Sequence, residues 1–231
     1  MIILDSIHKS FRNHTALENL CLKVASGEIY GLLGANGAGK STTLNLVLGF
    51  LQADSGTIHM PHPDHDSKIT SNEIGFIPEN VQLYPYLSGL ENLEYFCTLA
   101  GRNYSQIELS HFLTTCGLQQ DAHKKRTSEY SKGMRQKVGI AIAMAKQAKI
   151  YLLDEPASGL DPLASNELST LLKNLAADGA AILMASHDLF RVRETCTRIG
   201  ILKRGRLVKE ILSNDVTSKE LEDIYLNFMK D

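Results

Sequence analysis

The sequence is poor in several residue types that would restrict its class. It has no tryptophan, six prolines and four cysteines in 231 residues. The cysteines lie far apart and form no C-x-x-C pair, which argues against a disulfide framework or a zinc site. We therefore expect scattered core thiols in a reducing compartment, at Cys21, Cys97, Cys116 and Cys196.

Excess charge and long hydrophobic runs are also missing. With 24 basic and 26 acidic residues the net charge is −2, so no overall field favours nucleic acid as a partner. The most apolar stretch, residues 138–145, stops at Lys146, far short of the ~20 residues that cross a bilayer. The first residues lack the basic and apolar segments of a signal peptide. We expect a soluble, cytoplasmic protein that reaches a membrane only through a partner.

A glycine-rich stretch at residues 34–42 fits the pattern G-x-x-x-x-G-K-[ST] of a phosphate-binding loop. Residues 28–33 before it form an apolar run typical of a buried strand, and residues 42–48 after it carry apolar side chains at helical spacing. Backbone N–H groups and the positive end of the helix dipole converge in such a loop and bind anions. We predict that ATP binds there, at Gly34, Ala35, Asn36, Gly37, Ala38, Gly39, Lys40, Ser41 and Thr42.

Four side chains are expected to act on the phosphates, the metal ion and the attacking water. Lys40 is expected to neutralise the β- and γ-phosphates, and the Ser41 hydroxyl is expected to ligate Mg²⁺. An acidic pair, Asp154 and Glu155, follows the apolar residues 150–153, so a buried strand would place it at the sheet edge where α/β proteins bind ligands. Asp154 is expected to hold Mg²⁺, and Glu155 to polarise the water that attacks the γ-phosphate.

The order of the expected elements indicates an α/β fold with a parallel sheet core and a helical insertion. Weak alternation in residues 1–9 predicts an edge strand. Further strands are expected at residues 20–24, 28–33, 57–60, 74–78, 150–153, 180–185, 198–202 and 207–211. A final amphipathic helix is expected to be capped by Ser218 or Ser213.

We expect one domain built from this pattern. Its parts are an ATP-binding core at about 1–87 and 150–212, a helical subdomain at about 88–149 and a C-terminal helix at about 213–231. Inside the core, residues 61–66 form a proline-broken polar segment that offers metal ligands at His62, Asp64, His65 and Asp66. Its two prolines and dense polarity favour a solvated loop over a metal site.

Three further stretches carry a family resemblance: Y-S-K-G-M-R-Q at residues 130–136, S-G-L-D-P at 158–162 and A-S-H-D at 185–188. Together with the phosphate loop they resemble the ATP-binding cassette (ABC) family of transporter ATPases over essentially the whole chain. The resemblance implies the P-loop ABC-ATPase fold, in which the parallel core carries an antiparallel N-terminal β subdomain and an inserted helical subdomain.

The resemblance also implies a shared, two-copy site. Two cassettes would pack head to tail as a homodimer, and each ATP would lie between the phosphate loop of one and the signature stretch of the other. One copy would contribute the side chains of Lys40, Ser41, Asp154, Glu155 and the switch histidine His187. The partner would contribute Ser131 and Gly133 of the signature. Lys132 of the signature and Asp161 of the D-loop are also expected to take part in nucleotide binding. Phe11 resembles the aromatic residue that stacks on adenine.

The sequence departs from the family pattern at Glu79, at Lys132 and Met134 of the signature, and at Ser158. Glu79 stands where the family usually has a glutamine that touches Mg²⁺ and water; a carboxylate can do the same, but it adds a negative charge beside phosphate. Lys132 stands in place of a signature glycine and adds a cation, which does not oppose phosphate binding. Ser158 replaces the commoner threonine, a minor change.

The stretches P-E-N at residues 78–80, residues 83–93 and the signature resemble ABC-2 type exporter ATPases, and among them the ATPase of the nitrous-oxide-reductase copper-site maturation transporter. A multidrug, lipid or polysaccharide exporter is the alternative. Residues 79–96 are expected to contact the membrane permease through the aromatic side chains Tyr84, Tyr86, Tyr95 and Phe96. The competing interpretation is ordinary helical core, above all for Phe96.

Other functional classes fit less well. A DNA-repair or chromosome-structure ATPase needs a long coiled coil between the phosphate loop and the signature, and residues 43–129 show no sustained heptads. A translation-factor ATPase carries two cassettes in one chain, and this sequence has one. A P-loop nucleotide kinase lacks the stretches around Ser131 and His187.

Overall fold

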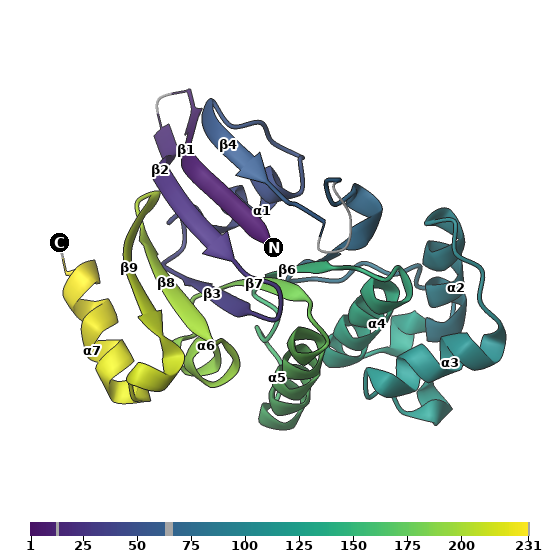
Figure 1. Ribbon diagram of the computed structural model, residues 1–231. Coiled ribbons are helices and arrows are strands. Elements are labelled where there is room, and N and C mark those ends of the chain that lie inside the picture. The colour runs from purple at the N-terminus through teal and green to yellow at the C-terminus, as the bar shows by residue number, and fades with distance from the viewer. Residues whose placement is uncertain (13, 63–66, 231) are drawn as a thin grey trace.

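The computed structural model describes residues 1–12, 14–62 and 67–230. A three-stranded antiparallel sheet lies above a six-stranded, mostly parallel sheet, and a group of helices stands at one end of the larger sheet (Figure 1). This arrangement confirms the predicted α/β fold class with an antiparallel N-terminal sheet.

The smaller sheet has the strand order β2-β1-β4. Its strands are β1 (Ile2–Phe11), β2 (His14–Val24) and β4 (Ser55–His59). Because β1 pairs with both neighbours, the prediction of an edge strand in residues 1–9 was wrong. The register of β1 against β2 shifts between Leu4 and Ile7 and again before Lys9, and Ser6 has a φ of 52°. Such bulges interrupt the two-residue period, which is why a central strand showed only weak alternation.

The larger sheet has the order β5-β6-β7-β3-β8-β9 and supplies the edge on which the site is built. Its strands are β3 (Ile29–Leu33), β5 (Ile74–Ile77), β6 (Ile150–Asp154), β7 (Ala181–Ser186), β8 (Arg198–Lys203) and β9 (Arg206–Leu212). Every pairing is parallel except that of β8 with β9. The strands β3, β6 and β7 are buried on both faces, which explains their continuous apolar runs.

All α-helices except the first begin at a side-chain cap. Their bounds are α1 (Lys40–Val47), α2 (Gly89–Leu99), α3 (Gln106–Thr115), α4 (Lys132–Ala145), α5 (Pro162–Ala177), α6 (Leu189–Thr195) and α7 (Ser218–Met229). Ser88, Ser105 and Thr217 each form a capping box with the glutamate three residues later. The cap of α7 is therefore Thr217, and the predicted Ser218 and Ser213 were wrong.

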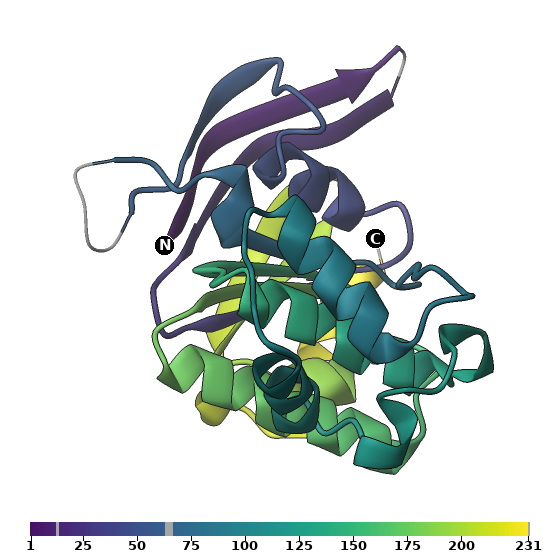
Figure 2. The same ribbon diagram turned by 90° about the vertical axis from the view of Figure 1, so that its right-hand side faces the viewer.

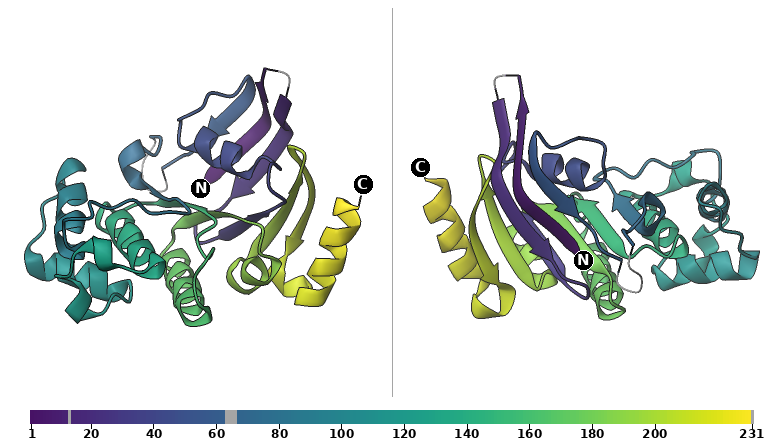
Figure 3. Two further views of the ribbon diagram at one scale, coloured as in Figure 1. Left: turned by 180° about the vertical axis from the view of Figure 1, so that it is seen from behind. Right: turned by 45° about the horizontal axis from the view of Figure 1, so that its top comes forward.

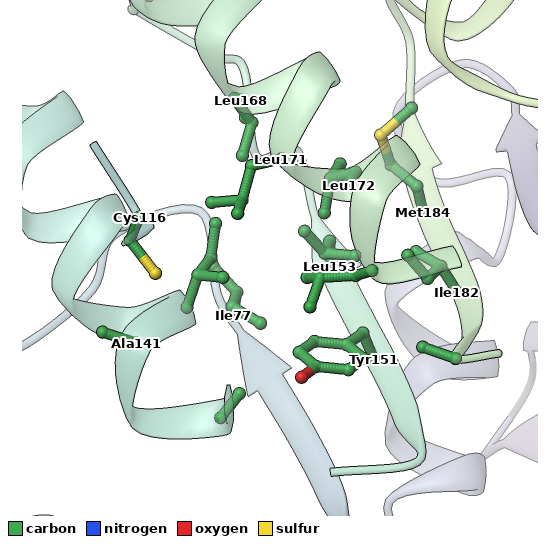
Figure 4. Packing of buried hydrophobic residues seen from close by; sticks show 14 of the residues in the cluster. Ile77, Cys116, Ala141, Tyr151, Leu153, Leu168, Leu171, Leu172, Ile182 and Met184 are labelled. Carbon is green, nitrogen blue, oxygen red and sulfur yellow. The ribbon is translucent and has the colours of Figure 1, made fainter. Parts of the chain in front are cut away.

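The two faces of the larger sheet pack into two different clusters. On one face, Tyr151 and Leu153 of β6 and Ile182 and Met184 of β7 point toward α5 (Figure 4). The alternate residues Leu152 and Leu183 pack on the other face against α1 and the smaller sheet. The first cluster also contains buried residues of α2, α3 and α4, so the helical segment shares its core with the sheet.

The outer helices lie at opposite ends of the molecule. Seen from behind, α2 and α3 stand at one end of the molecule and α7 at the other (Figure 3, left). Viewed from the helical end, α2 and α3 lie in front of the larger sheet (Figure 2). Cys97, Cys116 and Cys196 are buried as expected, but Cys21 is exposed on β2, which corrects the expectation of a core thiol there. Among the described residues, no helix combines the length and apolar character that crossing a bilayer requires.

Candidate nucleotide site

Three neighbouring strand ends create the site. In the sheet, β7 lies between β6 and β3, and all three run parallel, so their carboxyl ends meet at one edge. The glycine loop follows β3, the acidic pair ends β6, and His187 follows β7. Segments more than 100 residues apart, such as Ser41 and Asp154, are thereby within hydrogen-bond distance. Sheet edges of this kind are where α/β proteins bind ligands.

The glycine loop needs its glycines for conformation and for space. Gly37 and Gly39 have φ values of 78° and 111°, in the region that favours glycine. A Cβ on Gly39 would lie 2.6 Å from the carbonyl oxygen of Ala16, so the β2 backbone leaves no room for a side chain. Gly39 directly precedes α1, whose first residue is Lys40. The loop thus brings the N-terminus of α1 to the sheet edge, where its dipole favours anions.

Lys40 lies at the bottom of this site and is only 6% exposed. Its Nζ donates to the carbonyl oxygens of Gly34 at 2.6 Å and Ala35 at 3.3 Å. It also lies 3.5 Å from Oε1 of Glu155. A buried ammonium needs such partners, because an unpaired charge in low dielectric is costly. Phosphate oxygens would satisfy Lys40 in the same way as these acceptors do.

Ser41 and Asp154 form an oxygen pair suited to Mg²⁺. The Ser41 hydroxyl donates to Oδ2 of Asp154 at 2.9 Å. Adjacent ligands on an octahedral Mg²⁺ with bonds of 2.0–2.1 Å lie about 3 Å apart, so the two oxygens fit the ion. Burial raises the pKa of Asp154; the negative charges of Glu155 and Glu79 add to the rise, while the bond from Ser41 opposes it. A bound cation would favour the charged form.

Glu155 occupies a strained and well-connected position. Its φ of 46° lies in the left-handed region, which is uncommon for a residue with a Cβ and is often found at functional sites. The carboxylate contacts His187 Nδ1 at 2.8 Å and accepts hydrogen bonds from the Ser186 hydroxyl at 3.0 Å and the His187 amide at 3.3 Å. Ser186 was not predicted as a site residue, although its place beside His187 on β7 was a usable signal.

A cavity of about 350 Å³ joins these groups to the β1–β2 hairpin. Phe11, His14 and Ala16 line it together with the glycine loop and the acidic pair. Phe11 is 42% exposed, and Lys9 lies 5.4 Å from its ring centre. An exposed aromatic ring beside a phosphate loop is suited to stacking on a base. His14 was missed by the sequence analysis, although it pairs with Phe11 across the hairpin.

The signature residues do not line this cavity. Ser131 is exposed and caps α4 by accepting a hydrogen bond from the Met134 amide at 3.2 Å, and Gly133 lies in the first turn. Asp161 caps α5 through a hydrogen bond from the Ala164 amide at 2.9 Å. Glu79 does line the cavity, but its carboxylate is bound by Ser158 and by Lys132 of the signature stretch. The predicted residues therefore form two groups within one chain.

The predicted polar loop is only partly described. His62 Nε2 lies 2.9 Å from Oε1 of Glu73, while Asp64, His65 and Asp66 lie outside the described residues. Within residues 1–12, 14–62 and 67–230, no group of three or more histidine, cysteine or acidic side chains is placed to hold a metal ion.

Comparison with known proteins gives consistent results. Residues 17–158 match the family described as ABC transporter. The chain is 35% identical over 211 residues to the uncharacterized ABC transporter ATP-binding protein YdbJ of Bacillus subtilis, covering 90% of this chain and 68% of that protein. It is 38% identical over 208 residues to sll0415 of Synechocystis, covering 87% of this chain but only 59% of that relative, less than two thirds of its length.

A relative of similar length and two solved structures extend the comparison. The lantibiotic transport ATP-binding protein SrtF of Streptococcus pyogenes is 31% identical over 227 residues, covering 98% of this chain and 96% of that one. The structure of an ATP-binding subunit of an ABC transporter has a TM-score of 0.82 and 27% identity, and covers 98% of this chain and 99% of that one. A dimeric post-hydrolysis state of the cassette MJ0796 with ADP and Pi has a TM-score of 0.80 and 26% identity, with coverage of 92% and 99%.

Proposed function

The chain belongs to the ABC transporter family as an ATP-binding ATPase subunit, and on that premise we propose that it closes as a homodimer on ATP to drive a separate membrane permease. The observation that carries the proposal is the separation of the site into two groups. Lys40, Ser41 and the acidic pair face one cavity, whereas Ser131 and Gly133 begin α4 outside it. The exposed N-terminus of α4 supports a role in binding the phosphate held by another copy.

Within one copy, ATP binding exchanges partners around Lys40. The γ-phosphate takes the place of the Glu155 carboxylate, which lies 3.5 Å from the ammonium. Glu155 then remains bound by Ser186 and His187, in reach of a water beside the phosphate. We propose Glu155 as the residue that orients and deprotonates this water, with His187 holding the carboxylate. Mg²⁺, held by Ser41 and Asp154, would neutralise phosphate charge.

The proposed roles of the remaining residues follow the same division. Phe11 stacks on adenine, Glu79 takes part in metal and water binding, and Ser131, Lys132, Gly133 and Asp161 serve the partner's nucleotide. Closure depends on the γ-phosphate, because charge-assisted hydrogen bonds from both copies converge on it. Hydrolysis removes that shared group and lets the copies separate.

A permease contact at residues 79–96 is supported by an exposed aromatic cluster. Tyr84, Tyr95 and Phe96 pack with ring centres 4.9–6.1 Å apart, and Tyr86 nearby is 83% exposed. Aromatic side chains are enriched at protein interfaces. Such a permease would place the chain on the cytoplasmic face of the cell membrane.

For the cargo we propose export by an ABC-2 type permease, with copper-site maturation of nitrous-oxide reductase as the specific candidate. The support is the sequence resemblance at residues 78–93 and 130–136. Export of a multidrug, lipid or polysaccharide cargo is the alternative, and the name of SrtF adds lantibiotic transport to it.

Dimer closure is tested by sedimentation of the purified chain with ATP under conditions that block hydrolysis. We expect ATP to produce a dimer, and the Ser131→Arg variant to stay monomeric while binding ATP with unchanged affinity. A Ser105→Arg variant at the cap of α3 is the matched control, because it changes the same residue type outside the signature. An ATP-dependent dimer in the Ser131→Arg variant would contradict the shared site.

The exporter assignment is tested by the neighbouring genes and by co-purification with the permease they encode. A six-span permease beside a periplasmic repeat protein and a copper chaperone supports copper-site maturation. A multidrug or polysaccharide operon contradicts it and favours the alternative.

A further inference from the structure

Three segments of one chain meet at the carboxylate of Glu79. The Ser158 hydroxyl donates to Oε1 of Glu79 at 3.0 Å, and Nζ of Lys132 lies 3.6 Å from the same oxygen. Glu79 follows β5, Ser158 follows the acidic pair of β6, and Lys132 is the first residue of α4. Lys132 of the signature thus contacts Glu79, which lines the cavity beside the glycine loop of the same chain.

The Lys132 side chain lies beside Gly159. Gly159 has a φ of 69°, and a Cβ built on it would lie 3.7 Å from Cδ and 3.8 Å from Nζ of Lys132. The lysine stem therefore runs along the Gly159 backbone before its ammonium meets Glu79. One turn further along α4, Gln136 donates to the carbonyl oxygen of Pro156 at 3.2 Å. The same face of α4 thus contacts the segment that carries Glu155 at two points.

The charges of the cavity give this contact a consequence. Its lining contains three carboxylates, those of Glu79, Asp154 and Glu155, and the ammonium of Lys40. A nucleotide adds further negative charge, so each unpaired carboxylate opposes its binding. Lys132 supplies the cation that offsets Glu79, and it does so without entering the cavity lining.

We propose that Lys132 is a positioning residue that acts within its own chain: it holds Glu79 at the rim beside Ser158 and thereby sets the nucleotide affinity of the monomer. Without Lys132, Glu79 is released to turn toward Lys40 and compete with phosphate for that ammonium. This role differs from contact with a partner's ATP, because it operates before any dimer forms. It rests on the proposed nucleotide site.

The test is the binding of a fluorescent ADP analogue, mant-ADP, in EDTA at protein concentrations where sedimentation shows a monomer. We expect Lys132→Met to weaken binding about two- to fivefold, the range given by a partly exposed ion pair, and Lys132→Arg to restore it. Lys125→Met is the matched control, because it removes a lysine of the helical segment whose ion pair is with Asp121. Circular dichroism of each variant checks that the fold is intact.

The background of Glu79→Gln separates positioning from simple attraction. If Lys132 only attracted phosphate, its removal would weaken nucleotide binding by the same factor whether residue 79 is glutamate or glutamine, because independent contributions to the binding free energy add. We expect Lys132→Met to have less than half of its effect in the Glu79→Gln background. An equal effect in both backgrounds, or no effect on the monomer at all, overturns the proposal. Failure of the unmodified chain to bind mant-ADP would instead contradict the nucleotide site itself.

Discussion

Replacement of Glu155 by glutamine tests the central contact of the site in two ways. The substitution keeps the size and the acceptor oxygen but removes the charge that lies 3.5 Å from Lys40 and 2.8 Å from His187 Nδ1. Lys40 retains the carbonyl oxygens of Gly34 and Ala35 as partners. The variant should therefore fold, but with a buried ammonium that has lost its counter-charge.

The size of the effect follows from the distance. At 3.5 Å and an effective dielectric constant of about 20, the two charges attract each other by about 5 kcal/mol. The carboxylate is only 13% exposed. Removing its charge also removes the free-energy cost of holding that charge away from water, and this cost offsets about half of the attraction. The nucleotide-free variant should lose about 2–3 kcal/mol of unfolding free energy, which lowers Tm by about 5–10 °C in a chain of this size.

ATP should reverse most of this loss. Because the γ-phosphate no longer competes with Glu155 for Lys40, ATP affinity should rise about 10- to 50-fold, whereas ADP, which lacks that group, should gain much less. The rate of phosphate release should fall about 10²- to 10⁴-fold through loss of the base. Thermal unfolding is measured by circular dichroism with no nucleotide, ADP or ATP, since the chain has no tryptophan to report by fluorescence.

A matched variant separates the specific effect from loss of a carboxylate in general. Glu167→Gln removes an exposed partner of Lys137, at 2.7 Å, and should change stability by less than about 1 kcal/mol. If Glu155→Gln is as stable as the unmodified chain and gains no extra stabilisation from ATP, the Lys40–Glu155 contact has no energetic role. Hydrolysis at the normal rate would exclude Glu155 as the base.

Three other perturbations follow from the same structure. Lys40→Ala should abolish ATP binding in calorimetry, and undiminished binding would refute the phosphate loop. Phe11→Ala should weaken ATP and ADP equally, by about 1–2 kcal/mol, whereas the exposed Phe50 outside the cavity should tolerate alanine; equal effects at both positions would exclude stacking. Backbone hydrogen bonds lower the pKa of the capping-box glutamates below the ordinary 4.5, so the stability that they add is present above 4.5 and is lost as pH falls through the lower folded values. Acid titration of Tm should show this loss, and Glu→Gln variants should reduce it, at Glu91, Glu108 and Glu220.

Local patterns were sufficient to predict the parallel core and which motifs follow its neighbouring strands. The strands β3, β6 and β7 are apolar runs, and each is followed or ended by a chemically distinctive feature. The glycine loop follows β3, Asp154 ends β6, and His187 follows β7. Parallel strands place their carboxyl ends at one edge, so the order of motifs along the chain already implied that they meet. The hydrogen bond between Ser41 and Asp154 agrees with that reasoning.

The features that the sequence analysis missed have two causes: some depend on contacts between segments that carry no local signal, and one has a local signal that was overlooked. The bulges of β1 weakened its alternation and concealed a central strand. Thr217 is the N-cap of α7 because Thr217, and not Ser218, lies three residues before a glutamate and can form a capping box with it. The pairing of Lys132 with Glu79 joins residues 53 positions apart through a helix start and a loop, and neither position has a periodic pattern.

Several charged and polar side chains that line the cavity beside the glycine loop already have partners in their own chain, and these partners must be exchanged when a nucleotide binds. Lys40 is bound by carbonyl oxygens and Glu155, Ser41 by Asp154, and Glu79 by Ser158 and Lys132. Nucleotide binding is therefore an exchange of hydrogen bonds and ion pairs, so its net free energy is a small difference between large terms. A ligand gains the most binding free energy when it replaces the Glu155 contact of Lys40, and we expect the γ-phosphate of ATP to do this better than a nucleotide that lacks it. We therefore expect a single copy to bind ATP more tightly than ADP before a second copy contributes any contact.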